Sequence, residues 1–341
     1  MEYRSLGRTG VQVSKLCLGC WMFGRSTAEA ESAEIIDRAL EAGINFLDTA
    51  NMYSRGLSEE FVGRALKRNG KRQRVVLATK VYGPMEDDDP NAMGVHRRHI
   101  VEQCEASLRR LQTDHIDIYQ IHRPVSHVPI DETLRALDDL IRAGKVLYIG
   151  TSTYAAWQIM ESLWVSRELG LNRFVSEQPP YNLLDRRAER ELIPMAQTYG
   201  LGILPWSPLA GGFLTGKYRR GEERPEGSRY HPAGHADDRA VERRRSVFVD
   251  SAFDVVEGIE ALARDKGCSI SELALAWVAQ QPGVSSTIIG PRTVEQLYEN
   301  LDALDVELSD EDLGRIDEIA PPGRAAVSFY DGDFGPHPFR W

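Results

Sequence analysis

The sequence predicts an α/β protein in which eight parallel strands close into a (β/α)8 TIM barrel. Two observations carry this prediction: eight short apolar runs alternate with longer segments of helical spacing, and no linker rich in Pro, Gly or Ser interrupts the alternation. The runs are almost continuously apolar, which is typical of parallel strands buried on both faces. Eight strand-then-helix units in one chain favour a closed barrel over an open doubly wound sheet. We therefore expect a single barrel domain that spans residues 1–341.

Each predicted strand is one of the short apolar runs. In chain order they cover residues 15–19, 44–50, 75–81, 116–122, 146–152, 174–178, 202–206 and 286–290. The predicted helices carry apolar side chains at intervals of three and four residues. They cover residues 28–41, 59–68, 97–111, 132–142, 155–168, 187–198, 253–264 followed by 271–280, and 293–301.

Three segments fall outside this alternation. Residues 1–13 contain Gly7 and Gly10 between alternating stretches, which predicts an N-terminal β-hairpin that plugs the barrel floor. Residues 218–245 predict a long polar loop after strand 7, too long for an ordinary strand–helix connection. The C-terminal tail, residues 320–341, has little periodicity but is rich in aromatic residues. We expect this tail to form a lid over the site, with packing against the side of the barrel as the alternative.

Composition limits the classes of partner. The 341 residues have a formal net charge of −10, which argues against a nucleic-acid partner because phosphates require a basic surface. The longest apolar run, residues 273–279, is too short to span a bilayer, and the N-terminus has no signal-peptide core. Four cysteines do not make a secreted disulfide framework. We expect a cytoplasmic protein without nucleic-acid or membrane partners, and the sequence is compatible with a homo-oligomer.

Ionisable side chains follow several predicted strands, at the end of the barrel where this fold carries active sites. Asp48, Lys80 and His122 lie near strand ends, and Tyr53 follows shortly after the second strand. A buried ion pair with a core histidine is the alternative for each residue alone, but four groups at one rim favour a functional site. Their chemistry suits proton delivery to a carbonyl. We expect Lys80 to lower the pKa of Tyr53, Asp48 to keep Lys80 charged, and His122 to orient a substrate oxygen or share the proton.

Taken together, these residues and their order resemble the aldo-keto reductase superfamily. The matching stretches keep the family's order and lie at residues 46–53, 77–80, 111–122, 144–152, 205–210 and 288–300. The resemblance implies a (β/α)8 barrel that binds a nicotinamide cofactor without a Rossmann fold. It also implies a catalytic tetrad of Asp48, Tyr53, Lys80 and His122, and hence NADPH-dependent reduction of a small carbonyl substrate.

The resemblance further implies the cofactor contacts. Ser152 and Gln178 would hold the nicotinamide carboxamide, Trp206 would stack near it, and Cys20 and Trp21 would complete the rim. The pyrophosphate would lie along Ser207, Pro208, Leu209, Ala210 and Gly211, with Lys217 nearby. The adenosine end would contact Arg292, Gln296, Glu299 and Asn300, with Arg292 near a 2′-phosphate of NADP+. Arg229 would add a contact from the polar loop, and Asp48 and Gly290 complete the set.

Other signals predict no further chemistry. Residues 211–218 nearly match a P-loop, but Tyr218 stands where a magnesium-binding Ser or Thr is required. Cys17 and Cys20 lie on a predicted strand with no second cysteine pair, so we expect no metal site. The subgroup that the sequence resembles contains bacterial general reductases and potassium-channel β subunits. The alternatives are therefore a nicotinamide-binding, redox-sensing regulatory subunit, which in that subgroup carries Asn where His122 stands, or a biosynthetic ketoreductase acting on a deoxysugar intermediate.

Overall fold

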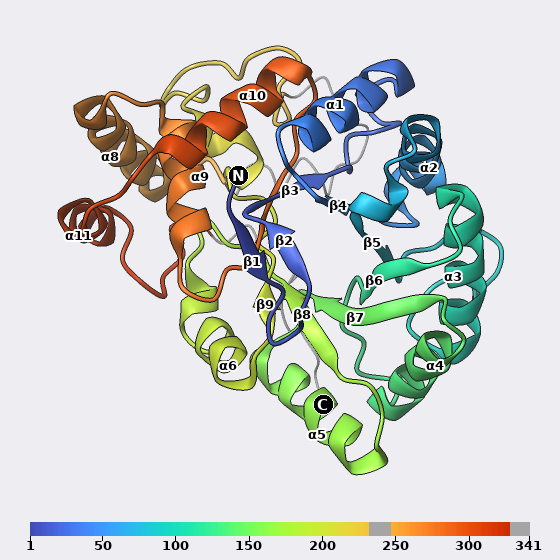
Figure 1. The fold of residues 1–341 in the computed structure, drawn as a ribbon. Helices are drawn as coiled ribbons and strands as arrows, with labels where there is room; N and C mark the ends of the chain where they lie inside the picture. Colours follow the sequence, from blue (N-terminus) through green and yellow to red (C-terminus); the bar gives the residue numbers. More distant parts are fainter. Residues whose placement is uncertain (232–246, 328–341) are drawn as a thin grey trace.

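Eight parallel strands form the centre of the computed structural model, which describes residues 1–231 and 247–327 (Figure 1). The strands follow the order β10-β3-β4-β5-β6-β7-β8-β9, so β3 to β9 pair in chain order and β10 pairs with β3. Their bounds are β3 Leu16–Gly19, β4 Phe46–Asp48, β5 Val76–Val81, β6 Ile116–Ile121, β7 Val146–Ser152, β8 Phe174–Gln178, β9 Gly202–Ile203 and β10 Thr287–Ile289. All eight predicted strands are thus present.

The sheet closes between its first and last members. The Ser285 N–H donates to the Ile203 carbonyl at 2.9 Å, and the Ile288 N–H donates to the Pro205 carbonyl at 2.9 Å. These bonds join β10 to β9 and complete the ring, which confirms the predicted (β/α)8 barrel. The two closing strands are short because Pro205 has no N–H to extend the ladder.

Helices surround the barrel (Figure 1). They are α1 Glu29–Glu41, α2 Leu57–Asn69, α3 Arg97–Leu111, α4 Ile130–Arg142, α5 Ala156–Leu169, α6 Leu192–Tyr199, α8 Asp250–Lys266, α9 Ile270–Gln280, α10 Val294–Asp302 and α11 Asp310–Ile319. Each buries an apolar stripe against the sheet or a neighbouring helix. Within the described residues, no helix is both long and apolar enough to cross a membrane.

The predicted floor hairpin is present. Strands β1 (Tyr3–Ser5) and β2 (Gln12–Ser14) pair antiparallel and lie across the barrel opening in Figure 1. Leu6 and Val13 are fully buried and pack with the barrel-interior residues Cys17, Phe46 and Ile118. Gly7 adopts a φ of +55°, and a Cβ there would come within 2.6 Å of the Gly202 backbone nitrogen, so only glycine lets the hairpin approach β9 this closely.

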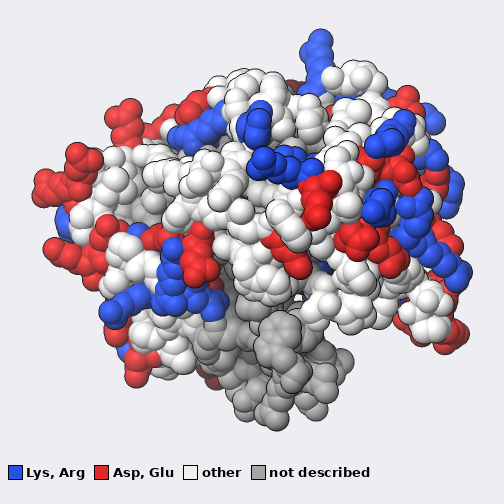
Figure 2. Space-filling model, turned by 90° about the horizontal axis from the view of Figure 1, so that it is seen from below, with Lys and Arg blue, Asp and Glu red and all other residues white. Residues whose placement is uncertain are grey.

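The polar loop after β9 is tied to α8 through its described part. Arg219 forms two hydrogen bonds with Glu260, and Arg220 forms ion pairs with Asp250, Asp254 and Glu257. Residues 232–245 of the predicted loop, and the tail from residue 328 with its predicted lid role, lie outside the described residues. Elsewhere, positive and negative groups interleave on the face shown in Figure 2.

Candidate active site

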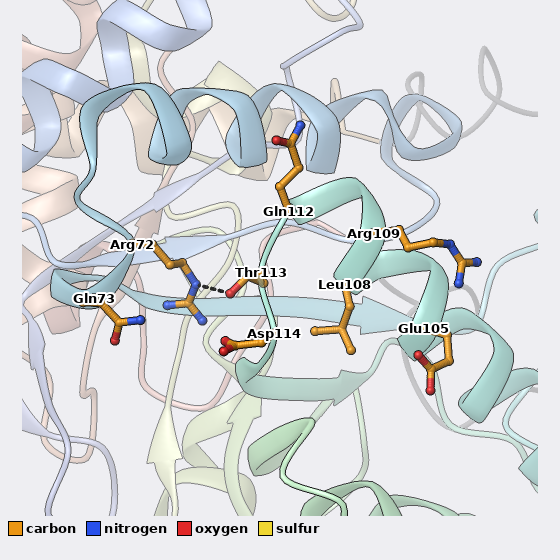
Figure 3. Close-up of a pocket in the computed structure, with 8 residues that line it drawn as sticks. All are labelled: Arg72, Gln73, Glu105, Leu108, Arg109, Gln112, Thr113 and Asp114. Atoms are coloured by element: carbon orange, nitrogen blue, oxygen red, sulfur yellow. Dashed lines mark hydrogen bonds between the residues drawn. The ribbon is translucent and has the colours of Figure 1, made fainter.

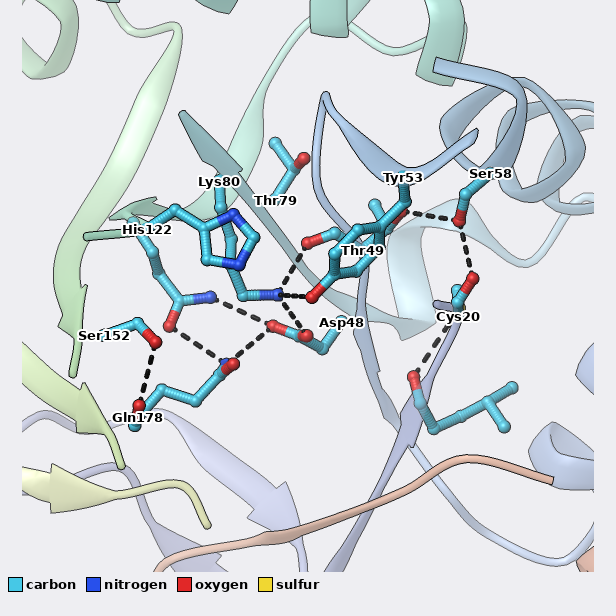
Figure 4. A network of polar contacts seen from close by, with 12 residues as sticks. Cys20, Asp48, Thr49, Tyr53, Ser58, Thr79, Lys80, His122, Ser152 and Gln178 are labelled. Carbon is cyan, nitrogen blue, oxygen red and sulfur yellow. Dashed lines mark hydrogen bonds and ion pairs between the residues drawn. The ribbon is translucent and has the colours of Figure 1, made fainter. Parts of the chain in front are cut away.

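The predicted ionisable residues converge at the carboxyl ends of the strands (Figure 4). Asp48 is the last residue of β4, Lys80 lies near the end of β5, and His122 directly follows β6. Parallel pairing places Asp48 opposite Ala78 and Lys80 opposite Gln120, which brings the three strand ends to one rim. Asp48, Lys80 and His122 are all buried there.

Lys80 is the centre of the cluster. Its Nζ is completely buried, forms an ion pair with Asp48, donates to the Thr49 carbonyl at 2.8 Å, and lies 3.3 Å from the Tyr53 hydroxyl (Figure 4). A buried ammonium is costly unless each of its donors has a partner, and here all three donors have one. The tyrosine hydroxyl therefore occupies the third position around a fixed positive charge.

A turn with unusual backbone angles positions Tyr53. Ser54 and Arg55 adopt φ of +49° and +53°, a region that L-residues rarely populate, and Gly56 follows at +97°. Downstream, the Ser58 hydroxyl donates to the Cys20 carbonyl at 2.7 Å and ties the start of α2 to the end of β3. Such angles persist only where the surroundings enforce them, and they cluster at functional sites.

The electrostatics of Tyr53 differ from the sequence-based expectation. Burial raises the pKa of Tyr53, and this effect outweighs the lowering by the Lys80 ammonium, so the pKa lies above its ordinary value. Lys80 does lower the pKa of Tyr53, as expected, but the net shift is upward, because sequence spacing does not reveal complete desolvation. Burial also lowers the pKa of Lys80, but Asp48 and Tyr53 together raise it above the ordinary value.

His122 stands against the tyrosine ring. The two rings meet edge-to-face with centroids 5.6 Å apart. Burial, followed by the charges of Arg123 and Lys80, holds the pKa of His122 well below its usual range, so the imidazole is neutral at physiological pH. Its Nδ1 is buried and has no hydrogen-bond partner in the described structure. The ring is available to interact with a substrate oxygen.

Two glutamines extend the cluster. Gln120 and Gln178 each donate a side-chain N–H to Asp48 Oδ1, at 3.0 and 2.9 Å, and Gln178 also donates to Gln120 Oε1 at 3.3 Å. The Ser152 hydroxyl lies beside them and donates to the Gln178 carbonyl at 2.9 Å (Figure 4). Gln120 was not predicted as a site residue, although it precedes His122 by two residues and therefore shares its face of the strand.

The predicted phosphate-contacting cations also gather. The charges of Arg292 and Arg229 lie near Lys217 and, together with burial as the larger cause, lower its pKa. The Arg229 guanidinium lies over the Trp21 ring at 4.4 Å, and Arg25 lies over the same ring at 4.7 Å. Within the described residues, none of these four cations forms an ion pair with a carboxylate. Unlike most surface arginines of this chain, they are left available to an anion, which fits the phosphates of a dinucleotide. Arg25 gave no signal in the sequence.

The loop after β9 is shaped to approach a ligand. Ser207, Ala210, Gly211 and Gly212 all adopt positive φ, and the Gly211 N–H donates to Ser207 Oγ at 3.1 Å. A Cβ on Gly212 would lie 2.7 Å from Lys217 Nζ, so glycine makes room for that ammonium. Pro208 and Leu209 lie within the same loop, and Trp206 directly precedes it.

The remaining predicted residues divide into two groups. On the eighth unit, Gly290 precedes Arg292, whose N–H donates to Gln296 Oε1 at 2.9 Å, and Glu299 and Asn300 lie further along α10. On the first strand, the Cys20 thiol is fully buried in the core and contacts the Leu18 carbonyl. The Cys20 thiol is therefore directed into the core, and its backbone is engaged as well, because its N–H donates to the Asp48 carbonyl and its carbonyl accepts from Ser58 and Phe23. The predicted contact from Cys20 to the cofactor stays a prediction.

A surface hollow lies at the amino ends of the barrel strands, opposite the candidate active site. It measures 540 Å³ and is open, and Thr113 and Asp114, just before β6, are among its lining residues (Figure 3). Arg72 donates to Thr113 Oγ1 there at 2.9 Å. The amino ends of barrel strands serve stability rather than catalysis, so we assign this hollow no ligand. Among the described residues, no group of three or more His, Cys, Asp or Glu side chains is placed to hold a metal ion.

Comparison with known proteins agrees with this geometry. The model of the aldo/keto reductase family matches residues 15–321. The chain is 42% identical over 339 residues to an uncharacterized oxidoreductase, YrpG, of Bacillus subtilis, covering 97% of this chain and 99% of the relative. It is 40% identical over 313 residues to a probable voltage-gated potassium channel subunit beta of Oryza sativa, covering 90% and 92%. It is 36% identical over 345 residues to versiconal hemiacetal acetate reductase of Aspergillus parasiticus, covering 94% and 98%.

The barrel, the buried cluster at its rim and these matches define the class of protein as an oxidoreductase. The chain belongs to the aldo/keto reductase family, as its sequence motifs indicated.

Proposed function

We propose that this protein reduces an aldehyde or ketone to the alcohol with NADPH, and that Tyr53 is the general acid. The observation that carries the proposal is the Tyr53 hydroxyl, buried 3.3 Å from the Lys80 ammonium at the carboxyl end of the barrel. When bound, NADPH supplies a hydride to the carbonyl carbon. The protein has to supply the proton and to stabilise the charge that develops on the carbonyl oxygen.

Each member of the cluster has a task that follows from its surroundings. The raised pKa keeps the proton on Tyr53 at neutral pH, as a general acid requires. Lys80 stabilises the phenolate left after proton transfer, and Asp48 keeps Lys80 charged and in place. His122, neutral and edge-on to Tyr53, orients the carbonyl oxygen. The low dielectric of the site strengthens all of these interactions.

The donor set supports a phosphorylated nicotinamide cofactor. Ser152 and Gln178 would hold the carboxamide beside Trp206, and the Ser207–Gly211 loop with Lys217 would hold the pyrophosphate. Arg292, at the start of α10, would contact the 2′-phosphate that distinguishes NADPH from NADH, because a guanidinium binds two phosphate oxygens in a fork. Gln296, Glu299 and Asn300 would contact the adenosine. We place the enzyme in the cytoplasm, a compartment compatible with its four free cysteines.

The test is NADPH oxidation by the purified chain across aldehydes, ketoses, quinones and keto-sugars. We expect substrate-dependent oxidation with at least one class, together with NADPH binding in the absence of substrate. Binding without substrate-dependent oxidation in any class would refute a reductase. The keto-sugar arm addresses the alternative of a biosynthetic ketoreductase.

A second candidate is a redox-sensing regulatory subunit. The observation that favours it is the 40% identity to a probable voltage-gated potassium channel subunit beta. A sensor must keep its cofactor state for long periods, so it is expected to show at most one slow turnover. Repeated turnover in the same oxidation assay separates the enzyme from the sensor.

A further inference from the structure

Glu177 is a buried carboxyl group that the proposed chemistry does not use. It lies on β8 between Ser176 and Gln178 and is fully inaccessible to solvent. Side chains alternate along a strand, so its carboxyl group points to the opposite face from the Gln178 amide. It is paired across the sheet with Thr151 of β7, next to Ser152. A buried acid at this position requires a structural explanation.

The groups that contact this carboxyl group come mainly from one short segment. The Tyr154 N–H donates to Glu177 Oε1 at 3.1 Å, and the Thr151 hydroxyl and the Thr153 N–H also stabilise the charged form. Glu177 Oε2 has no partner in the described structure. Among the described residues, the carboxyl group accepts its hydrogen bond from Tyr154, while the Thr151 hydroxyl and the Thr153 N–H donate to the Ser176 and Gln178 carbonyls. All three residues belong to the 151–154 turn that carries Ser152.

The 151–154 turn has a backbone conformation that requires stabilising contacts. Thr153 adopts a φ of +59°, which is a rare conformation for a β-branched residue. Its hydroxyl accepts from Arg123 at 3.1 Å, and the same Arg123 nitrogen donates to the His122 carbonyl at 2.9 Å. Contacts thus run from Glu177 through the turn and Arg123 to the backbone of His122.

We propose that Glu177 is a positioning residue that holds the 151–154 turn, and that gain or loss of its proton changes the affinity of this end of the site for the nicotinamide. The inference rests on the proposed function. The ionised carboxylate accepts a charge-assisted hydrogen bond from the Tyr154 N–H, whereas the protonated form accepts a weaker one and leaves an O–H without a partner. The ionised form therefore fixes Ser152 more firmly.

The groups around Glu177 place this change near neutral pH. Burial raises its pKa to about 8, against the lowering by Thr151, Thr153 and Tyr154 and by the Arg123 guanidinium. The Tyr154 phenol is the other titratable group that faces it, and its pKa is raised above the ordinary value by burial and by Glu177. Tyr154 therefore stays neutral in this range, and Arg123 stays charged.

The experiment is titration of NADPH by quenching of protein fluorescence at pH values from 7 to 9. Glu177→Gln keeps the shape of the side chain and removes its titration, and Glu161→Gln on the exposed face of α5 is the matched control. We expect NADPH affinity in the wild type to gain about three- to ten-fold over this range relative to Glu177→Gln. Glu161→Gln should follow the wild type.

Thr151→Val provides a second, independent test. It removes a hydroxyl that lowers the pKa of Glu177, so the midpoint of the affinity change should move to higher pH. Parallel profiles for the wild type and Glu177→Gln, or an unmoved midpoint in Thr151→Val, overturn the inference while leaving the reductase intact. A wild type that binds no NADPH overturns the proposed function and this inference with it.

Discussion

Tyr53 is the residue on which the proposed chemistry depends most directly. Tyr53→Phe removes the hydroxyl beside Lys80 and changes little volume. We expect turnover to fall by about 10²–10⁴-fold, the typical contribution of a general acid, with NADPH affinity nearly unchanged. The measurements are steady-state turnover on the best carbonyl substrate and cofactor titration of the same preparation.

Tyr199→Phe, on the exposed surface of α6, is the control for a tyrosine hydroxyl lost elsewhere. It should match the wild type in both measurements. Near-wild-type turnover of Tyr53→Phe would remove Tyr53 from its assigned role.

Lys80 and Asp48 form a pair whose separation should affect stability as well as catalysis. Lys80→Met leaves the Asp48 carboxylate buried without its counter-charge, and breaking a buried pair costs about 3–5 kcal/mol. We expect the loss of unfolding free energy to lie near the lower end of this range, because Asp48 still accepts hydrogen bonds from Gln120 and Gln178. Denaturant unfolding measures the loss of stability.

The double variant Lys80→Met/Asp48→Asn tests whether the two residues act as a pair. Neutralising Asp48 should restore much of the lost unfolding free energy while turnover stays low. Additive losses in the double variant would show that the pair is not coupled.

At the scale of single residues, the sequence identified which groups meet but not the magnitude of their burial. Asp48, Tyr53, Lys80 and His122 follow successive strands, and barrel topology alone brings their side chains to one rim. The direction of the Tyr53 pKa shift required the complete desolvation that only the fold reveals. Arg25 lies outside any recognisable pattern, and its stacking on Trp21 and the nearby charge of Arg229 link it to the site.

At the scale of elements, a strong periodicity of apolar residues was sufficient to predict a helix and its bounds, and a weak periodicity was not. The predicted helix at residues 97–111 coincides with α3. The predicted helix at residues 187–198 was wrong at its start: a 3-10 turn, Arg187–Glu189, precedes α6, which begins at Leu192. This late start places Pro194 in the first turn, where its missing N–H costs nothing.

Helix α11, Asp310–Ile319, was not predicted. Its first turn is acidic and its apolar stripe is sparse, with Ile316 the one fully buried hydrophobic side chain among its residues. A capping box supplies the missing signal, because Ser309 Oγ accepts from the Asp312 N–H and Asp312 accepts from the Ser309 N–H.

Arg292 lies just before α10 and links this helix to the polar loop after β9. Its guanidinium donates to the Gly227 carbonyl at 3.3 Å, in the polar loop that also carries Arg229. Loss of a charge-assisted phosphate contact should cost about 1.5–3 kcal/mol. We therefore expect Arg292→Ala to weaken NADPH binding by about ten- to a hundred-fold and to leave NADH nearly untouched, as measured by fluorescence titration of both cofactors.

Arg292→Lys distinguishes the effect of positive charge from the effect of the two-nitrogen geometry of the guanidinium. A lysine keeps the positive charge but cannot bind two phosphate oxygens at once, so its NADPH affinity should lie between those of the wild type and Arg292→Ala. Equal losses for NADH and NADPH in Arg292→Ala would show that the residue shapes the loop and does not contact the 2′-phosphate.

At the scale of the whole molecule, the barrel supplies the rigidity that buried charges at its rim require. The floor hairpin closes one end of the interior with Leu6 and Val13, and the polar cluster occupies the other end. Burial of titratable groups has a consequence for global stability, because a group whose pKa differs between the folded and unfolded chain makes the unfolding free energy depend on pH.

Glu177 should dominate this dependence between pH 7 and 8. Its pKa is about 8 in the folded protein against an ordinary 4.5, so the folded chain keeps a proton that the unfolded chain has lost. The unfolding free energy should therefore fall as pH rises through this window, by up to about 1.4 kcal/mol per pH unit, and the contribution of Glu177 should end above pH 8. Equilibrium unfolding in denaturant at several pH values measures the slope.

The buried histidines do not obscure this slope. Burial lowers the pKa of His99 to about 4 and that of His122 well below 6.5, so their contribution to the unfolding free energy rises with pH, opposite in sign to that of Glu177, and is largely complete at about pH 7.5. Glu177→Gln should abolish the decline between pH 7 and 8, while Glu161→Gln retains it. An unchanged slope in Glu177→Gln would mean that the carboxyl group is already ionised at pH 7, because only a retained proton can couple Glu177 to stability in that range.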